Sequence, residues 1–126
     1  MLGEYDTMNL TANPYYKEML HRERLIPFFK NNKLVCFLTF YITDILEKYT
    51  QADAWEVLED NPDGKICYIS QLLTSKEPDN PKLSYEIWHR FKIYIKDNFN
   101  NVRFICWRRW DRKTQTVKTY KKEMGK

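Results

Sequence analysis

The chain has 126 residues, of which 16% are aromatic and 30% charged, and this length and composition suit one folded domain and exclude a disordered sequence of low hydrophobicity. Its net charge of +4 combines 8 basic and 13 acidic side chains over residues 1–81 with 13 basic and 4 acidic ones over residues 82–126. No apolar run approaches the roughly 20 residues that span a bilayer, and MLGEYDTMNL has no basic patch before an apolar stretch, so we expect a cytoplasmic protein without membrane contact.

The first third of the chain predicts an arm, a helix and a hairpin. Residues 1–13 are polar without a clear period and are expected to form a loose arm. The segment 14–24 is predicted to be helical, because Asn13 can cap it and Pro14 suits the first helical position. Leu25–Lys30 and Leu34–Thr43 are rich in branched and aromatic residues, and the asparagines between them predict a turn.

An irregular acidic segment, residues 44–63, follows, with one helical turn expected near residues 53–58. Lys65–Thr74 then predicts an interior strand, on which regular alternation would place Ser70 and Gln71 on opposite faces.

The best helical pattern starts at Pro81, with Asn80 as its cap. Its core-facing stripe consists of Leu83, Ile87, Phe91, Tyr94 and Ile95. Val102–Trp110 predicts a strand that lies parallel to the strand before the helix, according to the right-handed crossover rule. Thr116–Tyr120 predicts the last strand, which leaves 121–126 as a basic tail of a single domain covering residues 1–126.

Three cysteines, Cys36, Cys67 and Cys106, lie far apart in strand-like runs. No pair has the spacing of zinc ligands, and we expect buried free thiols and no metal.

The densest basic cluster consists of Arg108, Arg109, Arg112 and Lys113, interleaved with Trp107 and Trp110. Arginine and tryptophan together can grip phosphates and stack on bases, so the cluster predicts weak binding of polyanions without sequence preference. The alternative is a solvated sheet edge in which the two tryptophans pack on opposite faces.

The predicted elements follow one another as a hairpin, an acidic connection, the strand YISQLLT, a loop, a long helix and the strand RFICWRRW. This order resembles that of GNAT-type N-acetyltransferases over roughly residues 14–120, and it is most similar to that of small GNAT-like proteins of bacteriophages. The resemblance implies an α/β fold: a single-domain mixed twisted sheet with packed helices. It also implies that the strands flanking the long helix splay apart into a slot for the pantetheine arm of acetyl-CoA.

The resemblance assigns roles to individual residues. Leu72, Leu73 and Thr74 match the strand end that contacts pantetheine, and Tyr120 lies about where a tyrosine protonates the leaving thiolate. The loop between strand and helix occupies the pyrophosphate position, with Lys76, Asn80 and Lys82 as its cofactor-binding residues.

That loop departs from the family pattern, since Ser75–Asn80 contains no glycine and brings Glu77 and Asp79 toward a pyrophosphate. Two functions therefore stay open. One is an acyl-CoA-dependent N-acyltransferase, active or catalytically degenerate, whose amine acceptor is read by the acidic residues Glu56, Glu59, Asp60 and Asp63. The other is a non-enzymatic phage or mobile-element protein, in the host cytoplasm or the virion, that uses the fold to bind a protein partner.

Overall fold

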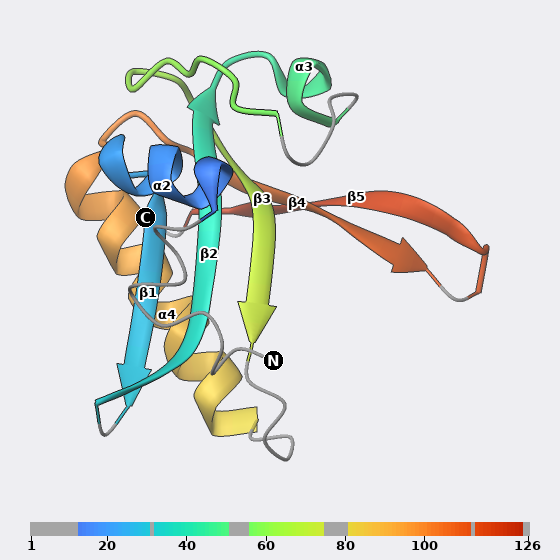
Figure 1. The fold of residues 1–126 in the computed structure, drawn as a ribbon. Helices are drawn as coiled ribbons and strands as arrows, with labels where there is room; N and C mark the ends of the chain where they lie inside the picture. Colours follow the sequence, from blue (N-terminus) through green and yellow to red (C-terminus); the bar gives the residue numbers. More distant parts are fainter. Residues whose placement is uncertain (1–12, 31, 51–55, 75–80, 112, 125–126) are drawn as a thin grey trace.

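The computed structural model describes residues 13–30, 32–50, 56–74, 81–111 and 113–124. In this part of the chain five strands form one sheet in the order β1-β2-β3-β4-β5 (Figure 1). The strands are β1 (Leu25–Lys30), β2 (Lys33–Thr43), β3 (Ile66–Thr74), β4 (Phe104–Asp111) and β5 (Thr116–Glu123). The helices are α2 (Pro14–His21), α3 (Leu46–Thr50) and α4 (Pro81–Asn98).

The sheet is mixed, as expected. β3 and β4 run parallel and are connected by α4, whereas the other neighbouring strands are antiparallel. In Figure 1, β4 and β5 cross β1–β3 at a large angle, which is the twist of a mixed α/β sheet. The predicted α/β fold and the predicted parallel pair are therefore confirmed.

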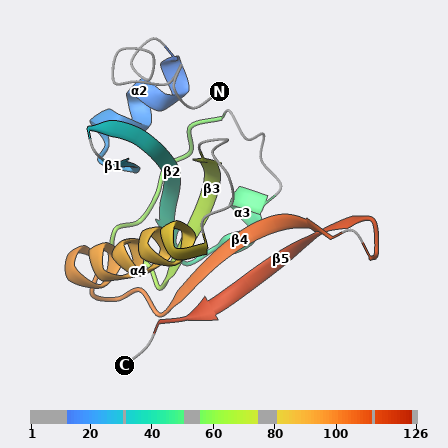
Figure 2. The ribbon, with the colours of Figure 1, turned by 90° about the horizontal axis from the view of Figure 1, so that it is seen from below.

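Each face of the sheet is covered by a helical layer (Figure 2). The face covered by α4, called here the α4 face, has a core that includes Phe40, Phe91 and Ile95, all fully buried. The opposite face, called the α2 face, packs against α2 and α3 around Tyr16 and Phe37. Of the predicted stripe, Phe91 and Ile95 are buried and Ile87 and Tyr94 partly so, while the side chain of Leu83 lies outside the described part.

Local chemistry explains the ends of the first elements. The Asn13 side chain accepts hydrogen bonds from the backbone N–H groups of Tyr15 and Tyr16 at 2.9 and 3.3 Å, so it caps α2 as predicted. The helix ends at His21, three residues before the predicted end, because Glu23 adopts a φ of 61° and leaves the helical path. Asn32 has a φ of 64°, the left-handed conformation that asparagine tolerates in a hairpin turn.

Two differences from the predicted elements lie near the functional region. The acidic connection contains the short helix α3. Of the helical turn expected near residues 53–58, residues 53–55 lie outside the described residues and 56–58 are not helical. β5 continues through Glu123, so residues 121–123 belong to the strand and not to a tail; they pair with Phe104–Cys106 of β4.

In the part of the chain that the structure describes, no helix is both long and apolar enough to cross a membrane.

Candidate functional site

The two parallel strands at the centre of the sheet separate partway along their length. β3 and β4 are paired from Ile66 opposite Phe104 to Ile69 opposite Trp107. β3 then continues to Thr74 and β4 to Asp111 without pairing with each other. The segment 70–74 has β2 on one side and pairs with no described strand on the other, so this strand edge faces the space between β3 and β4.

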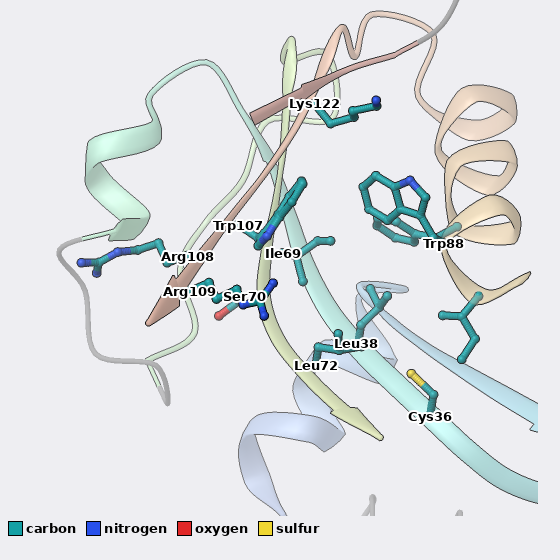
Figure 3. A pocket seen from close by; sticks show the side chains of 12 residues that line it. Cys36, Leu38, Ile69, Ser70, Leu72, Trp88, Trp107, Arg108, Arg109 and Lys122 are labelled. Carbon is teal, nitrogen blue, oxygen red and sulfur yellow. The ribbon is translucent and has the colours of Figure 1, made fainter. Parts of the chain in front are cut away.

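A cleft of about 620 Å³ occupies the place where the strands diverge (Figure 3). Its volume falls within the roughly 300–1,000 Å³ of typical small-molecule sites. The walls are mostly apolar and come from β2, β3, α4 and β4; they include Leu38, Ile69, Leu72, Trp88 and Trp107. Basic side chains border it as well, namely Arg108, Arg109 and Lys122, and no carboxylate does among the described residues. The cleft therefore suits an extended apolar ligand that carries negative charge.

A β-bulge lies on β3 at the cleft. The pairing of β2 with β3 moves from Thr39 opposite Gln71 to Phe40 opposite Ile69, so Ser70 has no partner residue on β2. The bulge turns Ser70 and Gln71 to the same face, where the hydroxyls of Tyr15 and Tyr16 donate to them at 3.4 and 2.7 Å. The alternation predicted for this strand was therefore wrong beyond Ile69. Ser70, which faces α2, still borders a cleft on the α4 face, because the sheet is open at this point.

Three aromatic rings form a row along the side of the cleft. The rings of Trp88 and Trp107 meet edge to face with centroids 5.5 Å apart, and Figure 3 shows both side chains at the cleft. Trp107 also stacks on Tyr120, with ring centroids 5.9 Å apart and planes 14° from parallel. Tyr120 thus lies on the strand next to β4, with Trp107 between it and the cleft, and 36% of its surface is exposed.

The structure brings part of the predicted cofactor site together. Leu72 lines the cleft and is 54% exposed, and Thr74 ends the same strand edge. The backbone of Leu73 lies between them, with its side chain outside the described part. Lys76 and Asn80 lie outside the described residues, and Lys82 is in the first turn of α4 with an undescribed side chain. The assigned strand end therefore borders the cleft, and the roles given to these residues stay predictions.

The predicted polyanion-binding residues that the structure describes are exposed, and two of them, Arg108 and Arg109, border the cleft. Arg108 and Arg109 are both exposed but point to opposite faces of β4. The guanidinium of Arg108 donates to the Thr50 carbonyl of α3 at 2.5 Å, whereas Arg109 lies on the α4 face with Trp107. Lys113 is exposed in the turn after β4, and Arg112 lies outside the described residues. Polyanion binding by this cluster stays a prediction.

The thiols are buried and protonated at neutral pH. Cys36 borders the cleft, and burial raises its pKa from 9.0 to about 12. Burial also raises the pKa of Cys67 and of Cys106, so none of the three is a thiolate nucleophile. Among the described residues, no group of three or more histidine, cysteine or acidic side chains could hold a metal ion.

The sequence did not predict two residues of the site, and it predicted another role for Asp60. Tyr15 contacts Ser70 at the bulge and Lys122 borders the cleft. Tyr15 was predicted only as part of an apolar helix stripe and Lys122 only as part of a basic tail. Asp60, expected among the substrate-reading acids, forms an ion pair with Arg24 at 2.5 Å and accepts from the Ile42 N–H at 3.3 Å. Glu56 and Glu59 are exposed beside it.

No protein-family model and no curated protein matches the sequence. Two solved structures are similar in fold. The loading GNATL domain of CurA from Lyngbya majuscula matches with a TM-score of 0.61 and 13% identity over 86% of this chain, which spans 60% of that domain's length. A presumed acetyltransferase from Staphylococcus aureus Mu50 matches with a TM-score of 0.58 and 17% identity over 98% of this chain and 87% of that one. The protein therefore has the α/β fold of GNAT-type acetyltransferases.

Proposed function

We propose that this protein is an acyl-CoA-dependent N-acyltransferase-like protein that binds acetyl-CoA weakly in the cleft between β3 and β4. The observation that supports the proposal is the separation of the two parallel strands after Ile69 and Trp107, which leaves a lined cleft beside a strand edge that pairs with no described strand.

The fit of the cofactor rests on backbone and shape. An extended arm of amide groups can hydrogen-bond to an unpaired strand edge as an added strand does, and such bonds require no particular side chain. The segment 70–74 offers such an edge, and Leu72 and Trp107 supply apolar walls beside it. Arg109 and Lys122 place positive charge at the cleft for a ligand that carries phosphates.

The chemistry divides between cofactor and protein. When bound, acetyl-CoA supplies an acyl group activated as a thioester. An amine acceptor has to reach that group, and the end of the β3–β4 pairing at Ile69 leaves the sheet open beside Ser70, which borders the cleft. In the transfer the amine nitrogen would bond to the acyl carbon as the C–S bond breaks; the nitrogen would give up a proton to solvent water, and the departing sulfur would take up a proton. We assign that proton to Tyr120, as the resemblance to GNAT-type acetyltransferases implies, since it is the only tyrosine after Tyr94; its ring stacks behind Trp107, so the hydroxyl has to reach the cleft past that ring.

The weakness of binding follows from the loop sequence. Ser75–Asn80 has no glycine, and Pro78 and Pro81 donate no N–H to a pyrophosphate. Glu77 and Asp79 add repulsion that Lys76 and Lys82 offset only in part. The same loop favours the second candidate function, in which the fold is a catalytically degenerate module. Such a protein, if encoded by a phage, would bind a protein partner in the host cytoplasm or the virion.

A pair of matched variants tests the site. Leu72→Glu places a carboxylate at the cleft, whereas Val117→Glu places one on β5, outside the residues that line it; the two side chains are 54% and 47% exposed, so both variants should fold. We expect millimolar acetyl-CoA to raise the melting temperature of the wild type and of Val117→Glu but not of Leu72→Glu, because ligand stabilises in proportion to its occupancy. An equal shift in all three proteins would place the cofactor elsewhere. No shift in any would favour the binding module.

A further inference from the structure

The strands β4 and β5 form a two-stranded ribbon that projects from the domain. Both ribbon views show it extending past the end of α4 (Figures 1 and 2). Every residue of β5 is exposed, and β5 is the last strand of the sheet, so its outer edge pairs with no described strand. A strand exposed on both faces that is nevertheless part of the sheet is a candidate contact surface.

One face of this ribbon alternates cations with aromatic rings. On β5, Lys118, Tyr120 and Lys122 lie two residues apart and so point to the same side, the α4 face. Directly opposite them on β4 lie Arg109, Trp107 and Ile105. This set of Arg109, Trp107, Lys118, Tyr120 and Lys122 is called here the ribbon face.

Positive charge is concentrated on the ribbon face. Arg109 and Lys118 are opposite each other in the strand register, so two cationic side chains lie next to each other. Arg109 and Lys122 form no ion pair with any described residue. The ion pairs found in the described part of the chain join Arg22 to Glu18 and Arg24 to Asp60.

The aromatic pair adds a second kind of contact. Trp107 and Tyr120 are stacked almost parallel, and Tyr120 keeps 36% of its surface exposed. A flat ring between cations is the arrangement on which an unpaired base stacks while neighbouring phosphates meet positive charge. A duplex hides the faces of its bases, so this chemistry selects a single strand.

We propose that the ribbon face binds single-stranded nucleic acid, with a base stacked on Tyr120 and phosphates at Arg109, Lys118 and Lys122. Lys118 and Lys122 are four residues apart on a strand, or about 13 Å. That distance spans about four stacked nucleotides. So small a site binds weakly and without sequence preference. The proposal requires neither acyl transfer nor a bound cofactor, and it shares Trp107, Arg109 and Lys122 with the cleft.

Fluorescence anisotropy with the full chain and a labelled oligothymidylate of about 12 nucleotides tests it. Three cations on a single strand give a slope of about −2 in log affinity against log salt, so affinity should fall about 20-fold between about 50 and 200 mM salt. No binding at 50 mM salt, a flat salt response, or tighter binding of a duplex of the same length would overturn the proposal.

Variants on the two faces of β5 make the test specific. Tyr120→Ala should weaken binding about tenfold, whereas Tyr120→Phe keeps the ring and should bind like the wild type. Lys122→Gln should flatten the salt slope by about 0.7. The matched control is Lys121→Gln. Lys121 is on the same exposed strand but on the opposite face, over the Phe104 ring. The affinity of this variant for the oligonucleotide should stay within about twofold of that of the wild type. A loss for Lys121→Gln equal to that for Lys122→Gln, or wild-type binding by Tyr120→Ala, would contradict a site on this face.

Discussion

Ile69 of β3 and Trp107 of β4 are the last residues at which the two parallel strands are paired, and beyond them the sheet opens. Both side chains border the resulting cleft, and Trp107 also contacts Trp88 of α4 and Tyr120 of β5. The position of this last pair fixes where an extended ligand could enter the sheet and which strand edge it would meet.

The stability of the core beneath α4 should depend strongly on the Phe91 side chain. This side chain is fully buried and meets the Phe40 ring edge to face at 5.6 Å. We expect Phe91→Ala to lower the free energy of unfolding by about 3–5 kcal/mol, as buried aromatic truncations do. Ile93→Ala on the same helix is the control, because Ile93 is 46% exposed and should cost under about 1 kcal/mol. Urea denaturation measures both; equal losses would mean that Phe91 is not a core residue.

The ion pair between Arg24 and Asp60 should contribute more than the other ion pair of the described residues. Its side chains are 11% and 15% exposed, and the guanidinium also lies 4.8 Å from the centre of the Phe99 ring. Asp60→Asn leaves this cation largely buried without its partner, and we expect a loss of about 3 kcal/mol.

The control for the ion pair is Glu18→Gln. It breaks the exposed pair with Arg22, whose side chains are 39% and 43% exposed, and should cost under about 0.5 kcal/mol. Chemical denaturation measures the free energy of unfolding of both variants. Similar small losses in both would show that the buried ion pair contributes little to stability.

Stability should fall in alkali because of the buried thiols. Burial raises the pKa of Cys36 from 9.0 to about 12, so the unfolded chain loses this proton at a lower pH than the folded one. The stabilisation is complete below about pH 9 and is lost as the pH rises toward about 12. Cys67 and Cys106 shift in the same direction. We expect urea midpoints to be steady near pH 7–8 and to decline above about pH 9, less steeply in Cys36→Ala. A midpoint that stayed level to about pH 11 would contradict the burial of these groups.

The two roles proposed for Tyr120 can be separated by one substitution. Tyr120→Phe removes the hydroxyl that would protonate the departing thiolate and keeps the ring that would stack on a base. Acyl transfer to an amine, followed by release of free thiol, should drop at least about tenfold. Binding of single-stranded nucleic acid should not change. Full transfer activity in Tyr120→Phe would assign the proton to another group.

Periodicity and turn residues predicted most of the fold, because these signals are local. Pro81 and the stripe through Phe91 and Ile95 predict α4, and a single helix between two interior strands predicts their parallel pairing. The length of β5 was underestimated, since Lys121–Glu123 is polar and gains its strand conformation from pairing with β4.

The details of the site depend on contacts between elements, which leave no local signal. The segment Ile69-Ser70-Gln71 alternates in sequence, yet the register of β2 against β3 places a bulge there. Tyr15 reaches Ser70 from a helix 55 positions earlier in the chain. Asp60 was expected among the acids that read an amine acceptor, and only its ion pair with Arg24 shows its structural role.

Calorimetric titration of the full chain with acetyl-CoA tests the central claim most directly. We predict saturable binding of one molecule per chain with a dissociation constant well above the micromolar range, retained in Val117→Glu and lost in Leu72→Glu. A constant of about 1 µM or tighter would contradict the weak binding inferred from the glycine-free loop. The absence of heat at millimolar cofactor, with the protein shown to be folded, would contradict cofactor binding in the cleft between β3 and β4.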